Sequence, residues 1–322
     1  MRSTFASFFN TRHKLSLLNW AAFVKNLRSS KNVGWRLARI GLMTFAGVAI
    51  LIMGFEDRLI YFPSKYPEGL WDVSRIPQVE GEIVPNIEDC YFVTSDGVKL
   101  HGWFCTPRRT ARGSLEPIPA DMVLLWFHGN AGNVTDRYDM IRVMMGIPVQ
   151  VFIVDYRGYG KSEGSPSEQG LYLDARAAWD YLVSERGVRP GNIIILGKSL
   201  GGVPAIDLAS KVDPAGLIVQ SSFTSAHDMA AAVMPLLPRF LIHSRMESVK
   251  KIPVVRCPKL FIHSPRDEVV PYELGRRLFD AASEPKQFYT VEGAGHNETY
   301  FVGGNRYVEA VRQFVESCRP PE

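Results

Sequence analysis

Six short apolar runs recur along the second two-thirds of the chain, and they constrain the fold more than any other feature of the sequence. They lie at 122–127, 149–154, 192–196, 216–221, 259–263 and 287–291. Near-continuous apolarity is typical of strands that are buried on both faces of a parallel sheet. Amphipathic helical patterns separate the runs, as at 167–185, and strands that alternate with helices need right-handed crossovers. We therefore predict an α/β domain with a mostly parallel, doubly wound sheet.

A β-hairpin is predicted before the first run, with its turn at Asp96-Gly97, because Asp-Gly suits two-residue hairpin turns. Such a turn places Cys90 opposite Trp103, so a Cys90–Cys105 disulfide would require a bulge. The four cysteines are too few for a disulfide scaffold, and their spacing matches no metal-ligand pattern.

One connection is long for a domain of this kind. Residues 222–252 separate the fourth run from the fifth, and a loop of this length inside a compact domain is usually functional. Its apolar residues include Met229, Met234, Leu236, Leu237, Phe240 and Leu241. Two interpretations remain open: an extra packed helix, or a short helical lid over a site.

The third run ends at a serine between glycines, in the sequence Gly197-Lys198-Ser199-Leu200-Gly201. This matches G-x-S-x-G, the nucleophile elbow, in which a strained turn between strand and helix exposes the serine hydroxyl. Side chains at the two outer positions would collide with the neighbouring strand and helix. The pattern arises by chance in roughly one chain in ten of this length, but the strand–turn–helix context makes it much more specific.

A serine hydroxyl needs a general base to act as a nucleophile. Asp267 follows the fifth run and His296 follows the sixth, which gives the order Ser, Asp, His. Since the carboxyl ends of parallel strands share one edge of the sheet, both side chains should lie near Ser199. We predict that His296 takes the Ser199 proton and that Asp267 orients the imidazole, with Glu268 as the alternative acid.

An oxyanion hole is predicted from the segment that follows the first run. The sequence WFHGNAGN (126–133) contains glycines that can free backbone N–H groups. We assign the hole to the backbone N–H groups of Asn130 and Leu200, with Ala131 as the alternative to Asn130.

The N-terminal part differs sharply in charge from the rest. Residues 1–39 hold eight Lys or Arg and no Asp or Glu, so their net charge is +8. Because the whole chain has a net charge of +4, the remaining residues have a net charge of −4. The residues Ile40–Phe55 that follow contain no charge, and about 20 apolar residues span a bilayer. We predict a basic arm at 1–36 and a transmembrane signal anchor at 37–55, although a core helix is an alternative.

Flanking charges give the expected orientation of that anchor. Basic residues before an apolar helix favour a cytosolic N-terminus, which would place the globular part in the periplasm or a lumen. Residues 56–84 hold three prolines and show no hydrophobic period, so they are interpreted as a linker to a domain at 85–322. The sequence suggests no metal, organic cofactor or nucleic-acid partner.

The chain resembles the α/β-hydrolase superfamily from about residue 50 to 320, on the motifs FHGNAGN, DYRGYGKSEGSPSEQGLYLDA, GKSLGG, SPRDEVVP and GAGH in this order. It is similar to the membrane-anchored branch that includes the bud-emergence-related hydrolases. More distantly, it is similar to the acyl-protein thioesterases that remove palmitoyl groups from proteins. The resemblance implies an α/β-hydrolase fold.

The same resemblance implies roles for particular residues. It makes Ser199, Asp267 and His296 a catalytic triad, and Asn130 and Leu200 the oxyanion hole. The residues Asp155, Arg157 and Tyr159 of DYRGYGKS also match a family motif, for which we expect a structural role near the site.

We therefore expect a membrane-tethered serine hydrolase that cleaves acyl esters or thioesters through an acyl-enzyme. Its substrates would be small molecules, lipids or acylated proteins, because an apolar lid beside a membrane anchor suits acyl chains. A serine peptidase or amidase is the alternative enzyme. A membrane-tethered scaffold that keeps the hydrolase fold without catalysis is the alternative of another class.

Overall fold

The computed structural model describes residues 33–44, 47, 54–77, 79–111 and 114–320. The chain divides into two compact units, Met1–Phe55 and Glu56–Glu322. In the first unit, residues 33–44 are helical. Among the described residues no helix has the length and apolarity to cross a bilayer. Much of the predicted anchor at 37–55, namely 45–46 and 48–53, lies outside the described residues, as does most of the basic arm.

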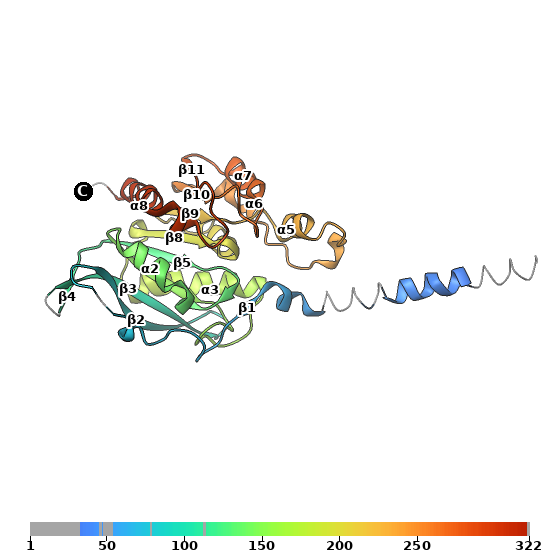
Figure 1. Cartoon of the computed structure of the whole chain (residues 1–322), viewed down its shortest axis with the longest axis horizontal. Coiled ribbons are helices and arrows are strands. Elements are labelled where there is room, and N and C mark those ends of the chain that lie inside the picture. The colour runs from blue at the N-terminus through green and yellow to red at the C-terminus, as the bar shows by residue number, and fades with distance from the viewer. Residues whose placement is uncertain (1–32, 45–46, 48–53, 78, 112–113, 321–322) are drawn as a thin grey trace, which may run out of the picture. The chain divides into compact units, whose positions relative to one another are not determined.

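A large sheet forms the centre of the second unit (Figure 1). Its strands are β2 (Ile83–Val93), β3 (Lys99–Ala111), β4 (Ser114–Pro117), β5 (Met122–Phe127), β7 (Val149–Asp155), β8 (Ile193–Lys198), β9 (Gly216–Gln220), β10 (Lys259–His263) and β11 (Lys286–Thr290). Over the described residues the order is β11-β10-β9-β8-β5-β7-β3-β2, with β4 paired to β3. The strands from β7 to β11 in this order are parallel, and β2, β3 and β4 are antiparallel. The predicted α/β fold with a mostly parallel sheet is confirmed.

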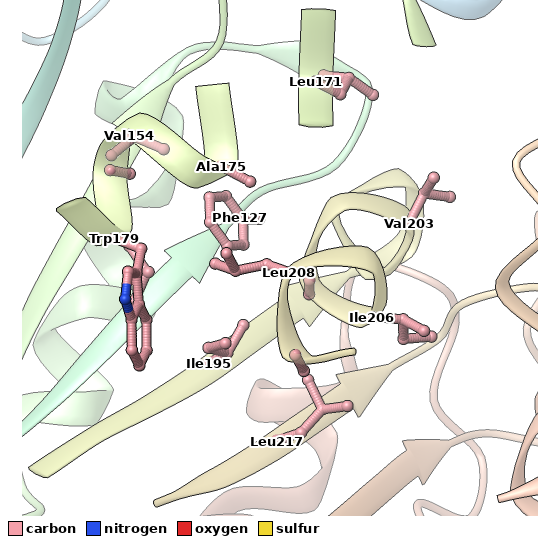
Figure 2. Close-up of a cluster of buried hydrophobic side chains, with 14 of the residues drawn as sticks. Phe127, Val154, Leu171, Ala175, Trp179, Ile195, Val203, Ile206, Leu208 and Leu217 are labelled. Atoms are coloured by element: carbon pink, nitrogen blue, oxygen red, sulfur yellow. The ribbon is translucent and has the colours of Figure 1, made fainter. Parts of the chain in front are cut away.

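Helices cover both faces of the sheet. α2 (Tyr138–Met145) and α8 (Thr299–Ser317) pack on one face. α3 (Glu168–Asp180), α4 (Gly202–Ala209) and α7 (Tyr272–Ala281) pack on the other. Figure 2 shows this second face, where Trp179 of α3 and Leu208 of α4 lie against the strand residues Phe127 and Ile195. Apolar layers on both faces explain why the parallel strands are apolar throughout.

The hairpin of β2 and β3 differs from its predicted register. Val93 pairs with Lys99 and Cys90 pairs with Gly102, so Cys90 does not face Trp103 as predicted. The loop has five residues because the Thr94 hydroxyl accepts the Val98 N–H at 2.9 Å and closes a wider turn. The four cysteines all lie in the described part of the chain, and all are free thiols.

The segment interpreted as a linker, 56–84, lies in the second compact unit rather than between units. β1 (Phe62–Pro63) pairs in parallel with β6 (Ala131–Gly132). Because these contacts use backbone atoms, no hydrophobic period marks them in the sequence. We call residues 56–68 the strap.

The long connection at 222–252 forms several short elements rather than one packed helix. They are α5 (Ala226–Val233), a 3-10 turn at Arg239–Leu241, α6 (Ser248–Lys251) and a second 3-10 turn at Ile252–Val254. Leu241 and Ile252 are buried, whereas Met234, Leu236 and Phe240 are exposed. We call residues 222–252 the insertion.

Candidate active site

Ser199 lies at the sharp turn between β8 and α4. Its φ is 54°, a left-handed value that strains a residue with a side chain. A side chain at Gly197 would meet the Gly201 carbonyl oxygen at 2.5 Å, and one at Gly201 would overlap the Phe127 carbonyl oxygen. Glycine is therefore required at both positions, for the steric reason predicted for an elbow.

His296 and Asp267 lie together at the carboxyl edge of the sheet. The His296 ring atom Nδ1 is 2.9 Å and 2.8 Å from the two Asp267 carboxylate oxygens. The Asp267 side chain is fully buried, and His296 is buried. This geometry holds the ring with Nδ1 toward the acid and Nε2 free to face a substrate or nucleophile.

The loop of His296 contacts the elbow of Ser199. The Lys198 ammonium donates to the Asn297 side-chain oxygen at 3.3 Å, and these residues directly precede Ser199 and follow His296. Among the hydrogen bonds of the described residues, none joins the Ser199 hydroxyl to the His296 ring. Catalytic hydrogen bonds are often long before substrate binds, and the Lys198–Asn297 bond keeps the two loops adjacent.

Asp267 is strongly stabilised as a carboxylate. Burial opposes its ionisation, but hydrogen bonds from His263 and His296 outweigh burial and hold the pKa of Asp267 well below its usual range. The backbone N–H groups of Val269 and Val270 also donate to its Oδ1, at 3.0 Å and 2.7 Å. A carboxylate that accepts several hydrogen bonds stays charged, so it can stabilise an imidazolium at His296.

The alternative acid, Glu268, occupies a different place. Its carboxylate accepts the backbone N–H of His296 at 3.0 Å, whereas both short contacts of the imidazole go to Asp267. Glu268 thus holds the backbone of the His296 loop, and Asp267 is the acid that contacts the imidazole ring.

The predicted oxyanion loop lies directly beside the serine. A side chain at Gly129 would lie 3.6 Å from the Ser199 Cβ. The Asn130 carbonyl accepts the Phe62 N–H at 2.9 Å and the Tyr159 hydroxyl at 2.7 Å. The Asn130 side chain in turn donates to the Ile60 carbonyl at 3.0 Å. The backbone of the loop is therefore fixed from two directions.

Residues of the DYRGYGKS motif hold this loop in place through hydrogen bonds. The Tyr156 hydroxyl donates to the His128 carbonyl at 2.7 Å, and the Val134 N–H donates to the Asp155 carboxylate at 2.9 Å. Arg157 lies further away, where it pairs with Asp174 and Asp96. These contacts are structural, and they show how the motif positions a neighbouring loop.

Lys198, directly before Ser199, is unusual because its ammonium side chain is buried. Burial, and then the nearby charge of Arg137, lowers the pKa of Lys198 to about 8. The attraction of Asp267 acts in the opposite direction. Lys198 and Arg137 supply positive charge near the site. The described residues include no cluster of His, Cys, Asp or Glu that could hold a metal ion.

Sequence reasoning missed three parts of this site. It assigned no role to His263, whereas His263 Nε2 lies 3.3 Å from the Asp267 carboxylate. It did not predict the Lys198–Asn297 bond. It also described the strap as a linker, although Ile60 and Phe62 hold Asn130. A search for polar residues at both ends of each strand could have flagged His263, but backbone contacts of the strap leave no signal.

Known proteins resemble the chain at several levels. Residues 118–251 match the family described as "Serine aminopeptidase, S33". An uncharacterised protein of Mycobacterium tuberculosis is 37% identical over 271 residues, which cover 84% of this chain and 90% of that protein. Alpha/beta hydrolase domain-containing protein WAV2 of Arabidopsis thaliana is 33% identical over 300 residues, which cover 87% and 93%.

A solved structure shares the architecture. The esterase Pf2001 of Pyrococcus furiosus superimposes with a TM-score of 0.61 at 19% identity, covering 81% of this chain and 98% of that chain. Likeness at this identity supports the fold, while WAV2 matches in sequence over nearly its whole length. On these grounds the chain belongs to the α/β-hydrolase superfamily.

Proposed function

We propose that the chain is a serine hydrolase that cleaves acyl ester or thioester bonds through an acyl-enzyme. The observation that carries the proposal is the pair formed by His296 and buried, ionised Asp267, set on the loop that contacts the Ser199 elbow. A buried Asp that orients a His beside a strained Ser is the arrangement that activates a hydroxyl.

In the proposed reaction, Ser199 Oγ attacks the acyl carbon while His296 Nε2 takes its proton. The backbone N–H groups of Asn130 and Leu200 stabilise the oxyanion of the tetrahedral intermediate. His296 then gives the proton to the leaving group, and the acyl group remains on Ser199. His296 then deprotonates a water, which attacks the acyl carbon. The bond between this carbon and Ser199 Oγ breaks, His296 returns the proton to Ser199 Oγ, and the acid is released. Asp267 stabilises the imidazolium in both halves of the reaction.

Preference for esters or thioesters over amides rests on the acidic residues of the insertion. A peptidase that binds a free N-terminus needs acidic side chains near it, and the insertion offers only Asp228, which pairs with Arg277, and Glu247, which pairs with Lys250. The solved Pyrococcus furiosus neighbour is named an esterase, which agrees with this choice. The name of the matched family favours a peptidase as the second candidate.

We also propose that residues 37–55 tether the enzyme to a membrane, as in the bud-emergence-related branch. The charge asymmetry of residues 1–39 supports a cytosolic N-terminus and an extracytoplasmic catalytic unit. A reporter fused to the C-terminus and active only outside the cytosol should give signal. Signal from a reporter that works only in the cytosol would refute this orientation.

A fluorophosphonate probe tests the nucleophile. We expect the wild type to be labelled and Ser199→Ala to lose labelling. Ser221→Ala is a matched control, because Ser221 also follows a strand and has a positive φ of 47°; this variant should label normally. Absence of labelling in folded wild-type protein would instead favour the non-catalytic scaffold.

A substrate panel then tests the bond and the acyl chain. We expect p-nitrophenyl esters of increasing chain length, and an acyl thioester, to be hydrolysed faster as the chain lengthens. An amide substrate of matched acyl chain should react more slowly. A short-chain optimum would remove the lipid part of the proposal, and a faster amide would favour the peptidase.

A further inference from the structure

Four large apolar side chains are exposed within eight residues in the middle of the insertion. Val233, Met234, Leu236 and Phe240 are 58%, 51%, 96% and 72% exposed. We call residues 233–240 the insertion tip. Single exposed apolar residues are common on soluble proteins. A contiguous cluster of several such residues instead marks an interaction site for a protein, a membrane or a ligand.

The exposure is built into the fold of the insertion. The Ser225 hydroxyl caps α5 by accepting the Asp228 N–H at 3.0 Å, and the Ala226 N–H donates to the Arg245 carbonyl at 2.9 Å. Leu241 is buried and fixes the returning chain. The base of the insertion is therefore held firmly while the tip projects outward, as the loop after α5 does in Figure 1.

The insertion lies where the chain enters the catalytic unit. Glu56, the first residue of that unit, accepts the backbone N–H groups of His243 and Ser244 at 2.8 Å and 2.9 Å. Leu59, in the same helical segment as Glu56, is also exposed. The uncharged run Ile40–Phe55 directly precedes Glu56. The residue that joins this run to the catalytic unit in the sequence is therefore the one that binds the insertion.

The charge of the tip suits a lipid surface. Residues 233–245 contain no Asp or Glu, and Arg239 and Arg245 are exposed at the tip and its base. Long cationic side chains can reach lipid phosphates while their apolar neighbours enter the acyl region. An apolar face enters a bilayer by about 5–10 Å in such interfacial binding.

We propose that the insertion tip binds the surface of a lipid bilayer, with Val233, Met234, Leu236 and Phe240 at the boundary between headgroups and acyl chains. This rests on the proposed membrane tether at 37–55. It adds a second, independent point of contact on the catalytic unit itself. The two contacts together fix the catalytic unit against the bilayer, so acyl groups presented at that surface become the favoured substrates.

Depth-dependent quenching tests the contact in the full chain reconstituted into phospholipid vesicles. Leu236→Cys, in a Cys257→Ser background, carries an environment-sensitive NBD dye, and the vesicles contain lipids with a doxyl quencher on the acyl chain. Val93→Cys is the matched control, because Val93 is also apolar and exposed, at 61%, but lies on the hairpin. We expect at least twofold stronger quenching at position 236 than at position 93.

Equal quenching at the two positions overturns the proposal. Blue-shifted dye fluorescence without doxyl quenching also overturns it, because a second copy of the chain or a protein would then cover the tip. Fluorophosphonate labelling of the same samples separates the two proposals. Labelled protein without quenching at position 236 refutes membrane contact by the tip alone, while unlabelled protein refutes the hydrolase.

A kinetic comparison supplies a second readout. We expect Leu236→Ser/Phe240→Ser to lower hydrolysis of a long-chain ester embedded in vesicles by about fivefold or more, and to leave hydrolysis of soluble p-nitrophenyl acetate unchanged. The control Val93→Ser/Leu115→Ser removes exposed apolar side chains elsewhere and should change neither rate. Loss of both rates in the tip variant, or of neither, contradicts the proposal.

Discussion

Two imidazoles, those of His263 and His296, share the carboxylate of Asp267. His263 approaches Oδ2 at 3.3 Å while its own Nε2 also lies 3.0 Å from the Val270 carbonyl. His263 therefore helps to hold Asp267 in place through Nε2, while His296 contacts the same carboxylate through Nδ1. The lowered pKa of Asp267 contributes stability that is complete above the unfolded value near pH 4 and is lost as the pH falls further.

The division of labour between Asp267 and Glu268 is testable. We expect Asp267→Asn to lower kcat/KM by about 10³–10⁴-fold, because the amide cannot hold the reactive tautomer or stabilise the imidazolium. Glu268→Gln should cost less than about tenfold, since Gln can still accept the His296 N–H. Ester hydrolysis under matched conditions gives both values, and a reversed ranking would make Glu268 the acid.

The buried ammonium group of Lys198 destabilises the folded state relative to the unfolded state. Its pKa is lowered to about 8, so below pH 8 the folded chain holds a buried charge that the unfolded chain exposes to water. The unfolded state binds more protons between about pH 8 and 10.5, and stability therefore rises with pH across that window.

We expect Lys198→Met to stabilise the chain at pH 7 by about 1–3 kcal/mol, since each pKa unit corresponds to about 1.4 kcal/mol. The gain should shrink between pH 8 and 10, as the wild-type lysine loses its proton. Urea unfolding at a series of pH values measures it. Lys99→Met, at an exposed position, is the control and should show no such trend. A constant difference at every pH would attribute the change to packing.

At the scale of elements, the turn between β8 and α4 depends on close backbone approach. The Phe127 carbonyl of β5 fills the space beside Gly201. The elbow is thus a joint of three elements, because the backbone of β5 limits the path that the chain can take between β8 and α4. The strained φ of Ser199 persists because these neighbours leave no alternative path.

Substitution at Gly201 tests that joint. We expect Gly201→Ala to destabilise the chain by about 2–3 kcal/mol and to slow fluorophosphonate labelling by about 10²-fold through displacement of Ser199. Gly191→Ala, where a new side chain would meet nothing within 4 Å, should leave both unchanged. Normal labelling of Gly201→Ala would mean that the elbow can relax.

Patterns within single elements were readable from sequence. The apolar runs at 122–127 and 259–263 coincide with β5 and β10, because burial on both faces requires apolar residues at every position. The hairpin register was wrong by one residue, because the Thr94 hydroxyl closes a wider loop than Asp-Gly alone would predict. The glycines of the elbow were read correctly since their reason is local and steric.

At the scale of the whole molecule, the strap connects the start of the catalytic unit to the loop beside Ser199. It pairs with the predicted oxyanion loop through β1 and β6, and its Glu56 end is hydrogen-bonded to the insertion. Sequence reasoning could not find this link, since the backbone hydrogen bond from the Phe62 N–H to the distant Asn130 carbonyl needs no particular side chain.

We expect Phe62→Pro to lower kcat/KM by about tenfold, because proline removes the N–H that holds the Asn130 carbonyl. Phe62→Ala retains that N–H and is the control for loss of the half-exposed ring. Comparison of the two variants on one ester isolates the hydrogen bond. Equal activity in both would show that the remaining contacts, from the Tyr159 hydroxyl and from the Asn130 side chain to Ile60, are sufficient to hold the loop.

The involvement of residues 56–68 in the catalytic unit also sets where this protein can be cut and joined. A chimera that replaces the N-terminal region with a tag, another anchor or a carrier protein should be spliced upstream of Glu56. A junction near residue 85, where the first long strand begins, would remove the residues that brace Asn130. A chimera spliced there could fold and still react slowly, and its poor turnover would then reflect the splice site rather than the chemistry of the enzyme.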